Sequence, residues 1–399
     1  MKLNKYVALA VLAATSLVTT ACGPSEPEPE PERTPQVVET PLSPVDTSDL
    51  WLPTQFDELE IVDPGWQTTP QYRDGVYLAA AEREGLLEFT AVDVHGAVLW
   101  AVQRPATCTG FALTVDATGR SLAVLSDVES SVDDLAATTA SAYDLNTGEL
   151  VWGPIAVPGR HIGPGLVYGP PPADFMGESG PRVVLNPTTG VVAASEAAND
   201  GVRVIGEYGG TVLLADKDSL TASDASDGSE LWSIPLAKNG WEMESLSPDF
   251  ESSPVDGFVF LGTSDATRAL VDLDDGTVIS ESVQDAAVDA ATGYLTVLDD
   301  AGLHSFDSEN TLQRSVSVSD NTSISASGGV LLYLREGDTV RAHNVLTGDI
   351  AQAYAPGGHG RIIVPSHMTE VGAAILLDGS KSLLATVPEF PTSTEEGNS

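Results

Sequence analysis

The chain has 399 residues, and 42% of them are hydrophobic, which is ample material for a core. It carries 58 acidic against 18 basic residues, a formal charge of −40 at pH 7. This balance argues against nucleic acid as a partner, because binding it needs clustered Lys and Arg to displace counterions. The acidity is typical of a protein that must stay soluble outside the cell, and the alternative is a cationic ligand or partner.

Residues 1–21 predict a signal peptide. Lys2 and Lys5 precede an apolar run over 6–18, which is shorter than the roughly 20 residues needed to span a bilayer. The following Thr19-Thr20-Ala21-Cys22 resembles the lipobox of bacterial lipoproteins, where a small residue precedes a cysteine that is diacylated and becomes the new N-terminus. The resemblance implies a lipid on Cys22, although Thr19 stands where that family usually has Leu. Plain secretion after ordinary cleavage is the alternative.

Residues 22–49 predict a disordered tether. The segment alternates Glu and Pro over 26–32, and such a composition cannot bury enough apolar surface to fold. Proline and like charges hold it extended, with a reach on the order of 75 Å at ~3.1 Å per residue. We interpret it as a spacer between a membrane and a folded domain.

One short sequence motif, the phrase, then recurs seven times along the chain. It consists of a polar residue, a few polar or small residues, a glycine and an apolar run, and its anchors are Gly96, Gly148, Gly190, Gly228, Gly276, Asn310 (a degenerate copy) and Gly348. A period of roughly 40–45 residues built of short strands is the signature of a β-propeller blade. The sequence therefore predicts one all-β repeat domain, which we place at 50–390, with a disordered tail over 391–399.

The chemistry of the turn explains the phrase. An Asp or Asn side chain accepts hydrogen bonds from backbone N–H groups two or three residues on, and glycine takes the positive φ that closes the hairpin. The leading acids are Asp144, Asp224 and Asp272. Three copies end in a tryptophan whose large face suits packing between neighbouring sheets, so we predict Trp100, Trp152 and Trp232 at equivalent inter-blade positions.

The phrase from Asp144 to Trp152 resembles the repeat of quinoprotein-like (PQQ-repeat) propellers. That family includes quinoprotein alcohol dehydrogenases and an outer-membrane assembly lipoprotein with a propeller body. The resemblance covers residues 75–385 and implies eight four-stranded blades, with seven as the alternative. Three strands of an eighth blade are expected within 360–387, and residues 56–62 are expected to supply its fourth, which would close the ring.

Catalytic and metal-binding patterns are absent from the sequence. Quinoprotein dehydrogenases hold their cofactor against a vicinal disulfide, and this chain has no adjacent cysteines. No two histidines stand four residues apart, and the loop from Asp272 to Gly276 lacks the downstream Glu of a calcium loop. We interpret Cys108 as a small buried hydrophobe. The prediction is therefore no catalytic residue, no metal site and no cofactor.

These observations favour a non-catalytic, monomeric scaffold that contacts envelope or secreted proteins. Export and the lipid would hold it on the outer face of the cytoplasmic membrane. A receptor for a small ligand or a cation, using the central channel or the acidic loops, is the first alternative. An enzyme built on a propeller scaffold is the second, because fold alone does not decide function.

Overall fold

The computed structural model describes residues 30–129, 137–170, 180–198, 201–248, 255–264, 267–337 and 339–389. The predicted signal peptide, Cys22 and the tail at 391–399 lie outside these residues. From Pro31 onward the chain forms one compact unit.

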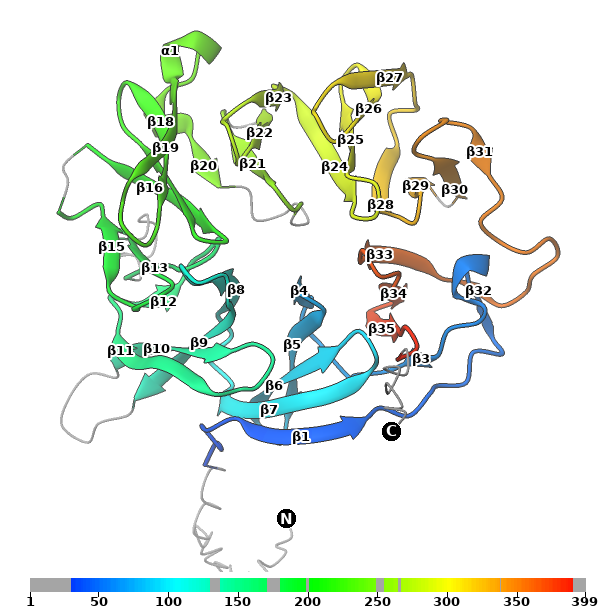
Figure 1. Cartoon of the computed structure of the whole chain (residues 1–399), viewed down its shortest axis with the longest axis horizontal. Helices are drawn as coiled ribbons and strands as arrows, with labels where there is room; N and C mark the ends of the chain where they lie inside the picture. The colour runs from blue at the N-terminus through cyan, green and yellow to red at the C-terminus, as the bar shows by residue number, and fades with distance from the viewer. Residues whose placement is uncertain are drawn as a thin grey trace, which may run out of the picture. The chain divides into compact units, whose positions relative to one another are not determined.

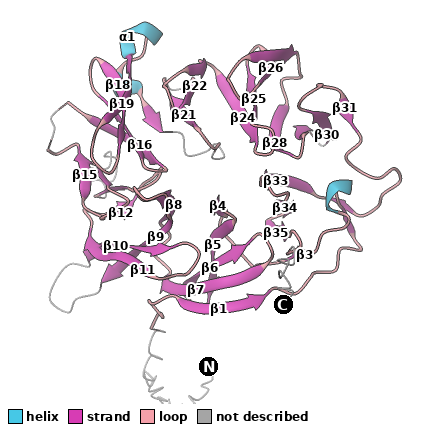
Figure 2. Cartoon of the chain, in the orientation of Figure 1, coloured by secondary structure: helices cyan, strands magenta, loops and turns pink. Residues whose placement is uncertain are grey.

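Eight four-stranded antiparallel sheets form a ring in this unit, so the prediction of an all-β propeller with eight blades is confirmed (Figures 1 and 2). Blade 1 consists of β4 (Gln71–Arg73), β5 (Val76–Arg83), β6 (Leu86–Asp93) and β7 (Ala97–Pro105), and blade 2 of β8 (Phe111–Val115), β9 (Ser121–Glu129), β10 (Ala137–Asp144) and β11 (Leu150–Ala156). Blade 3 consists of β12 (Arg160–His161), β13 (Val167–Gly169), β14 (Val183–Leu185) and β15 (Val192–Ser195), and blade 4 of β16 (Arg203–Tyr208), β17 (Thr211–Ala215), β18 (Ser219–Asp224) and β19 (Glu230–Pro235). Blade 5 consists of β20 (Ser247–Pro248), β21 (Phe258–Gly262), β22 (Arg268–Asp272) and β23 (Val278–Ser280), and blade 6 of β24 (Val283–Asp289), β25 (Tyr294–Asp299), β26 (Gly302–Phe306) and β27 (Leu312–Val316). Blade 7 consists of β28 (Thr322–Gly328), β29 (Leu331–Glu336), β30 (Thr339–Asn344) and β31 (Ile350–Ala351), and blade 8 of β33 (Val364–Met368), β34 (Ala374–Asp378), β35 (Lys381–Ala385) and β3 (Ile61–Val62).

The N-terminal strand β3 completes the last blade. It pairs with β35, with Ile61 opposite Ala385 and Val62 opposite Leu384. The strand is shorter than the predicted 56–62, because Thr54–Phe56 forms a short 3₁₀ helix that buries Phe56 between blades 7 and 8. A second contact between the two ends of the domain is the parallel pair of β2 (Leu50–Trp51) and β32 (Arg361–Ile362).

The structure departs from the sequence prediction within the tether. Gln36–Pro41, which the composition assigns to a disordered segment, forms strand β1 along the outer edge of blade 1 (Figure 1). It pairs with β7, Gln36 opposite Ala101 and Pro41 opposite Ala97. All six residues are exposed, so β1 is held by backbone pairing rather than by burial. The β-branched pair at 37–38 favours a strand, and an open sheet edge supplies the partners.

The repeat tryptophans join successive blades. The indole N–H of Trp100 donates to the carbonyl oxygen of Leu145 at 2.8 Å, and the equivalent bonds are Trp152 to Pro187 at 2.6 Å and Trp232 to Leu273 at 2.7 Å. Each acceptor lies in the turn of the following blade, and each ring is buried in the cluster between the two sheets. Burying one indole removes ~200 Å² from water.

Each of these rings also rests on the glycine of the turn that it bonds. A Cβ built on Gly148, Gly190 or Gly276 would come within 2.9, 2.7 and 2.7 Å of the indole of the preceding blade. Glycine is thus required for two reasons: the backbone φ is positive, and the indole ring leaves no room for a Cβ. Where Ala194 replaces the tryptophan, nothing lies within 4 Å of a Cβ built on Gly228. Arg314 takes the ring's place over Gly348.

The two reasons for glycine can be separated experimentally. Gly190 and Gly228 have the same backbone conformation, with φ of +73° and +74°. We predict that Gly228→Ala lowers the free energy of unfolding by about 1 kcal/mol, the cost of a left-handed L-residue. Gly190→Ala should cost about 1–3 kcal/mol more, because the new methyl collides with Trp152. Denaturant titration of both variants measures the difference, and equal losses would contradict the ring contact.

Candidate functional site

The innermost strands of the ring line a cavity of about 440 Å³, which we call the central cavity. Strands β4, β24, β28 and β33 contribute most of its wall. Its polar and titratable residues include Tyr72, Arg73, Asp256, Asp285, Ser327 and His367.

An aromatic group closes one side of this cavity and joins blades 1 and 8. The Tyr77 hydroxyl lies 3.0 Å from Nδ1 of His367, and the ring of Tyr72 lies 5.0 Å from the imidazole. Burial lowers the pKa of His367 against the opposing charges of Asp256 and Glu370, which favours the neutral ring at pH 7. Burial also raises the pKa of Tyr77, so its proton stays in place. The group therefore joins the two blades across the seam.

Glu207 ties three blades together beside the channel. Its carboxylate accepts hydrogen bonds from Thr114 Oγ1 at 2.6 Å, the Gly210 N–H at 2.6 Å and the Leu166 N–H at 3.1 Å. The side chain is 1% exposed. Burial raises its pKa, and these three bonds together with the charge of Arg73 oppose that rise. A Cβ on Gly165 would overlap the Glu207 carbonyl oxygen, which shows how closely the backbone approaches here.

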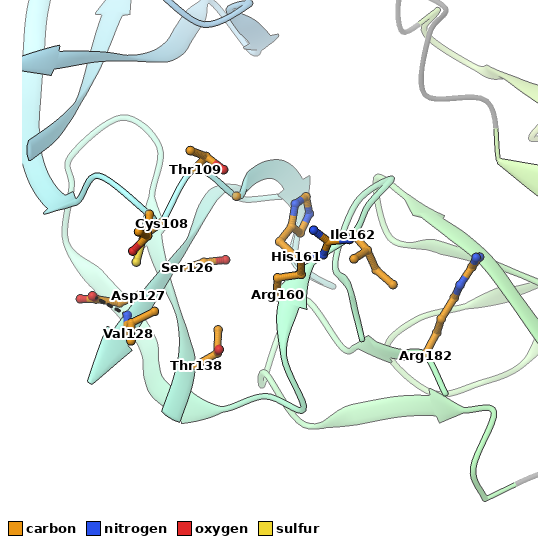
Figure 3. A pocket seen from close by; sticks show the side chains of 12 residues that line it. Cys108, Thr109, Ser126, Asp127, Val128, Thr138, Arg160, His161, Ile162 and Arg182 are labelled. Atoms are coloured by element: carbon orange, nitrogen blue, oxygen red, sulfur yellow. Dashed lines mark hydrogen bonds between the residues drawn. The ribbon is translucent and has the colours of Figure 1, made fainter. Parts of the chain in front are cut away.

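A second hollow, of about 540 Å³, lies between blades 2 and 3, and we call it the blade 2–3 cleft (Figure 3). Three segments form it: the loop before β8, the end of β9, and β12. The lining residues are Thr107, Cys108, Thr109, Gly110, Ser126, Asp127, Val128, Thr138, Arg160, His161, Ile162 and Arg182.

Burial disfavours the charged forms of Cys108 and His161 in this cleft. Burial raises the pKa of the Cys108 thiol, and the nearby Asp127 raises it further, so the thiolate is disfavoured. Burial lowers the pKa of His161, whose Nε2 donates to the Gly165 carbonyl oxygen at 2.6 Å. Asp127 pairs with Arg33 and Arg104.

Neither a metal ion nor the quinone implied by the repeat fits the described residues. Among them no group of three or more His, Cys, Asp or Glu could hold a metal ion. The Asp272 carboxylate, in the repeat turn, accepts hydrogen bonds from the Asp274 N–H and from the Asn310 side chain. The three repeat tryptophans lie between blades, not on a cavity floor, and the chain has no adjacent cysteines.

The twelve residues singled out by the repeat lie at turns and inter-blade seams, and none lines the central cavity or the blade 2–3 cleft. Sequence reasoning missed Glu207, because a single acid among 58 carries no signal. It also missed Arg160 and His161, although the Pro/Gly-rich stretch that follows them marks an irregular blade connection.

A family model described as outer membrane protein assembly factor BamB matches residues 136–364. The fold is similar to the crystal structure of BamB from Moraxella catarrhalis, with 15% identity over 82% of this chain and 98% of that one and a TM-score of 0.46. It is also similar to the computationally designed Ika8 protein (13% identity, 85% and 99% covered, TM-score 0.37) and to Saccharomyces cerevisiae Sqt1 (13%, 86% and 100%, 0.38). No curated protein matches the sequence. In the part of the chain that the structure describes, no helix is long and apolar enough to cross a membrane.

Glu207 predicts a pH dependence of stability. Its pKa in the folded chain is raised above the ordinary 4.5, so between these two values the folded state holds more protons than the unfolded state. Stability from this group is therefore full below pH 4.5 and is lost as the pH rises through the folded pKa. Between pH 4.5 and 7 the unchanged protein should lose free energy of unfolding relative to the Glu207→Gln variant, because glutamine does not titrate in this range. Urea titrations measure the free energies of unfolding of both proteins. If the difference between them stays constant with pH, the raised pKa of Glu207 is refuted.

Proposed function

Because the chain belongs to the family of the outer membrane protein assembly factor BamB, we propose that it is a membrane-tethered propeller outside the cytoplasm that serves as a non-catalytic scaffold for other envelope proteins. It would act as a monomer, with its partners bound on the outer rim of the ring.

The observation that carries this proposal is an apolar position repeated on the outermost strands. The second residue after the turn anchor is exposed in four blades: Leu150 by 56%, Val192 by 49%, Leu312 by 52% and Ile350 by 72%. In blade 1 the equivalent Val98 is only 9% exposed. There β1 lies along the edge and Leu42 packs in the same cluster.

Blade 1 therefore provides a pattern for how such an edge is covered. An extended segment adds itself as a further strand, and its backbone satisfies the open row of N–H and C=O groups. In blade 1 the chain itself supplies that segment, as strand β1. On the other rim edges a strand of a partner protein would serve, with apolar side chains meeting the exposed ones.

Blade 7 offers the most open edge of this kind. Strand β31 pairs with β30 at only two positions, because the chain then turns away and Ala353 and Tyr354 pair with the N-terminal segment at 53–54. The first three residues of β30 (339–341) are left without a fourth strand. A hollow of about 380 Å³ opens beside them, with Trp51, Tyr354 and Ile350 in its wall.

The non-catalytic part of the proposal rests on the two hollows. Burial raises the pKa of the Cys108 thiol in one hollow and of the Tyr77 hydroxyl beside the other, which disfavours both anionic nucleophiles. A scaffold needs rigidity instead, and a closed ring of sheets joined by buried indoles supplies it.

A photo-crosslinking amino acid placed at Ile350 tests the scaffold. We predict a discrete adduct with an envelope protein in intact cells, and its loss when Arg341→Glu and Leu346→Glu alter the neighbouring surface. The same crosslinker at Val371, which is 53% exposed but lies outside the outermost strands, is the matched control. Equal labelling at both positions, or no discrete adduct from Ile350 or Leu150, would contradict a rim-bound partner.

The tether yields a separate prediction. Mass spectrometry of the mature protein should find an N-terminus at Cys22 carrying a diacylglycerol thioether. Cys22→Ser should then move the protein from the membrane fraction to the soluble fraction without changing its circular dichroism, because one lipidated residue supplies the anchor. A mature chain that begins elsewhere and carries no lipid would show plain secretion instead.

A further inference from the structure

The blade 2–3 cleft gathers basic groups in a strongly acidic chain. Of the 18 Lys and Arg residues, four border it: Arg33, Arg104, Arg160 and Arg182. Asp127 is the one carboxylate among the lining residues, and Arg33 and Arg104 already pair with it. Among the lining residues, two arginines therefore outnumber the one carboxylate, in contrast to the whole chain.

Arg160 is the charged group that this arrangement leaves available. It lies on β12, the innermost strand of blade 3, and is exposed. Its side chain has no hydrogen bond or ion pair to the described residues, while the Arg182 side chain donates to the Val204 carbonyl oxygen at 3.2 Å. A guanidinium on a concave wall can bind an oxyanion through two parallel N–H bonds.

A buried hydroxyl lies in the wall of the cleft that β9 provides. Ser126 is 5% exposed, and Figure 3 shows its side chain pointing across the cleft toward β12. Its Oγ has no hydrogen-bond partner of normal geometry among the described residues, although the neighbouring Tyr168 hydroxyl interacts with it closely enough for Ser126 to oppose the rise in the pKa of that tyrosine. Leaving a buried hydroxyl unpaired is costly, so such a group points to a missing partner.

His161 completes the wall as a neutral group. Its Nε2 carries the proton that bonds the Gly165 carbonyl oxygen, and burial disfavours the imidazolium. Gly110 allows this close approach, because a Cβ there would lie 2.4 Å from the His161 Cβ. The positive charge at the mouth of the cleft therefore comes from arginine and persists at every physiological pH.

We propose that the blade 2–3 cleft binds the phosphate or carboxylate group of a small ligand, with Arg160 as the charged donor and Ser126 as a neutral one. The hydroxyl of Thr109 lies in the same wall and can add a third bond. A cleft of about 540 Å³ exceeds what an inorganic ion fills, so the oxyanion is one end of a larger molecule. The site is distinct from the outer rim and goes beyond the scaffold role.

Two sources can present this group, a free metabolite or the headgroup of an anionic lipid. The lipid is relevant because Arg33, near the end of the tether, pairs with Asp127 in the cleft wall. The test therefore uses inorganic phosphate and citrate as free probes, and vesicles of phosphatidylglycerol against vesicles of phosphatidylcholine.

Calorimetric titration of the full chain at pH 7 in low salt measures binding. The expected result is saturable binding of phosphate, citrate or phosphatidylglycerol vesicles, with a rise in Tm by mass action. Arg160→Gln should weaken it about tenfold, since a charge-assisted bond is lost, and Ser126→Ala should weaken it several-fold. Arg83→Gln is the control: Arg83 is an exposed arginine paired with Glu88 outside the cleft, and its loss should leave binding unchanged.

Binding of the free probes assigns a soluble ligand, and binding of phosphatidylglycerol vesicles alone assigns a lipid headgroup. No saturable binding of any probe would overturn the proposal, as would equal weakening by Arg160→Gln and Arg83→Gln. Unchanged circular dichroism of the variants shows that the fold is intact. The crosslinking experiment at Ile350 reads a different surface, so either proposal can fail alone.

Discussion

The contact on which this ring depends is an indole lying flat on a glycine. A four-stranded sheet cannot bury both faces by itself, so each blade must adhere to the next one. Trp100, Trp152 and Trp232 achieve this with one buried face and one N–H bond to the neighbouring turn. The turn glycine is part of the same joint, because only a residue without Cβ admits the ring. Seams without tryptophan, such as the one after Ala194, rely on smaller aliphatic side chains.

The repeat made this fold predictable, because its period, its turn residues and its tryptophans are all local signals. The count of eight blades came from the resemblance of this repeat to quinoprotein-like propellers, and the strands expected near the two ends of the domain agreed with it. The same signals could not give the boundaries of the domain. Gln36–Pro41 lies in a segment whose overall composition predicts disorder, and it forms a strand because blade 1 presents an edge to pair with. Phe56 was assigned to a strand, but the seam between blades 7 and 8 draws it into a 3₁₀ turn.

The hollows were beyond sequence reasoning for a related physical cause. Glu207 meets Thr114 and Leu166 from two other blades, and Arg160 and Ser126 line one cleft from two blades. Such sites are assembled from residues far apart in the chain, with no fixed spacing to recognise. The acidity of the sequence pointed toward cations, whereas the cleft between blades 2 and 3 is locally basic. A net charge describes the field at a distance and says little about one concave wall.

Strand β1 also has a mechanical consequence. Any pull applied through the N-terminal segment reaches the Arg33–Asp127 pair and then the ladder between β1 and β7 before it reaches β3. The ladder can peel from blade 1 while β3 stays in blade 8, about twenty residues further on. The strand that closes the ring is thereby shielded from load, because a pull on the N-terminal side would detach this edge strand before it opened the propeller.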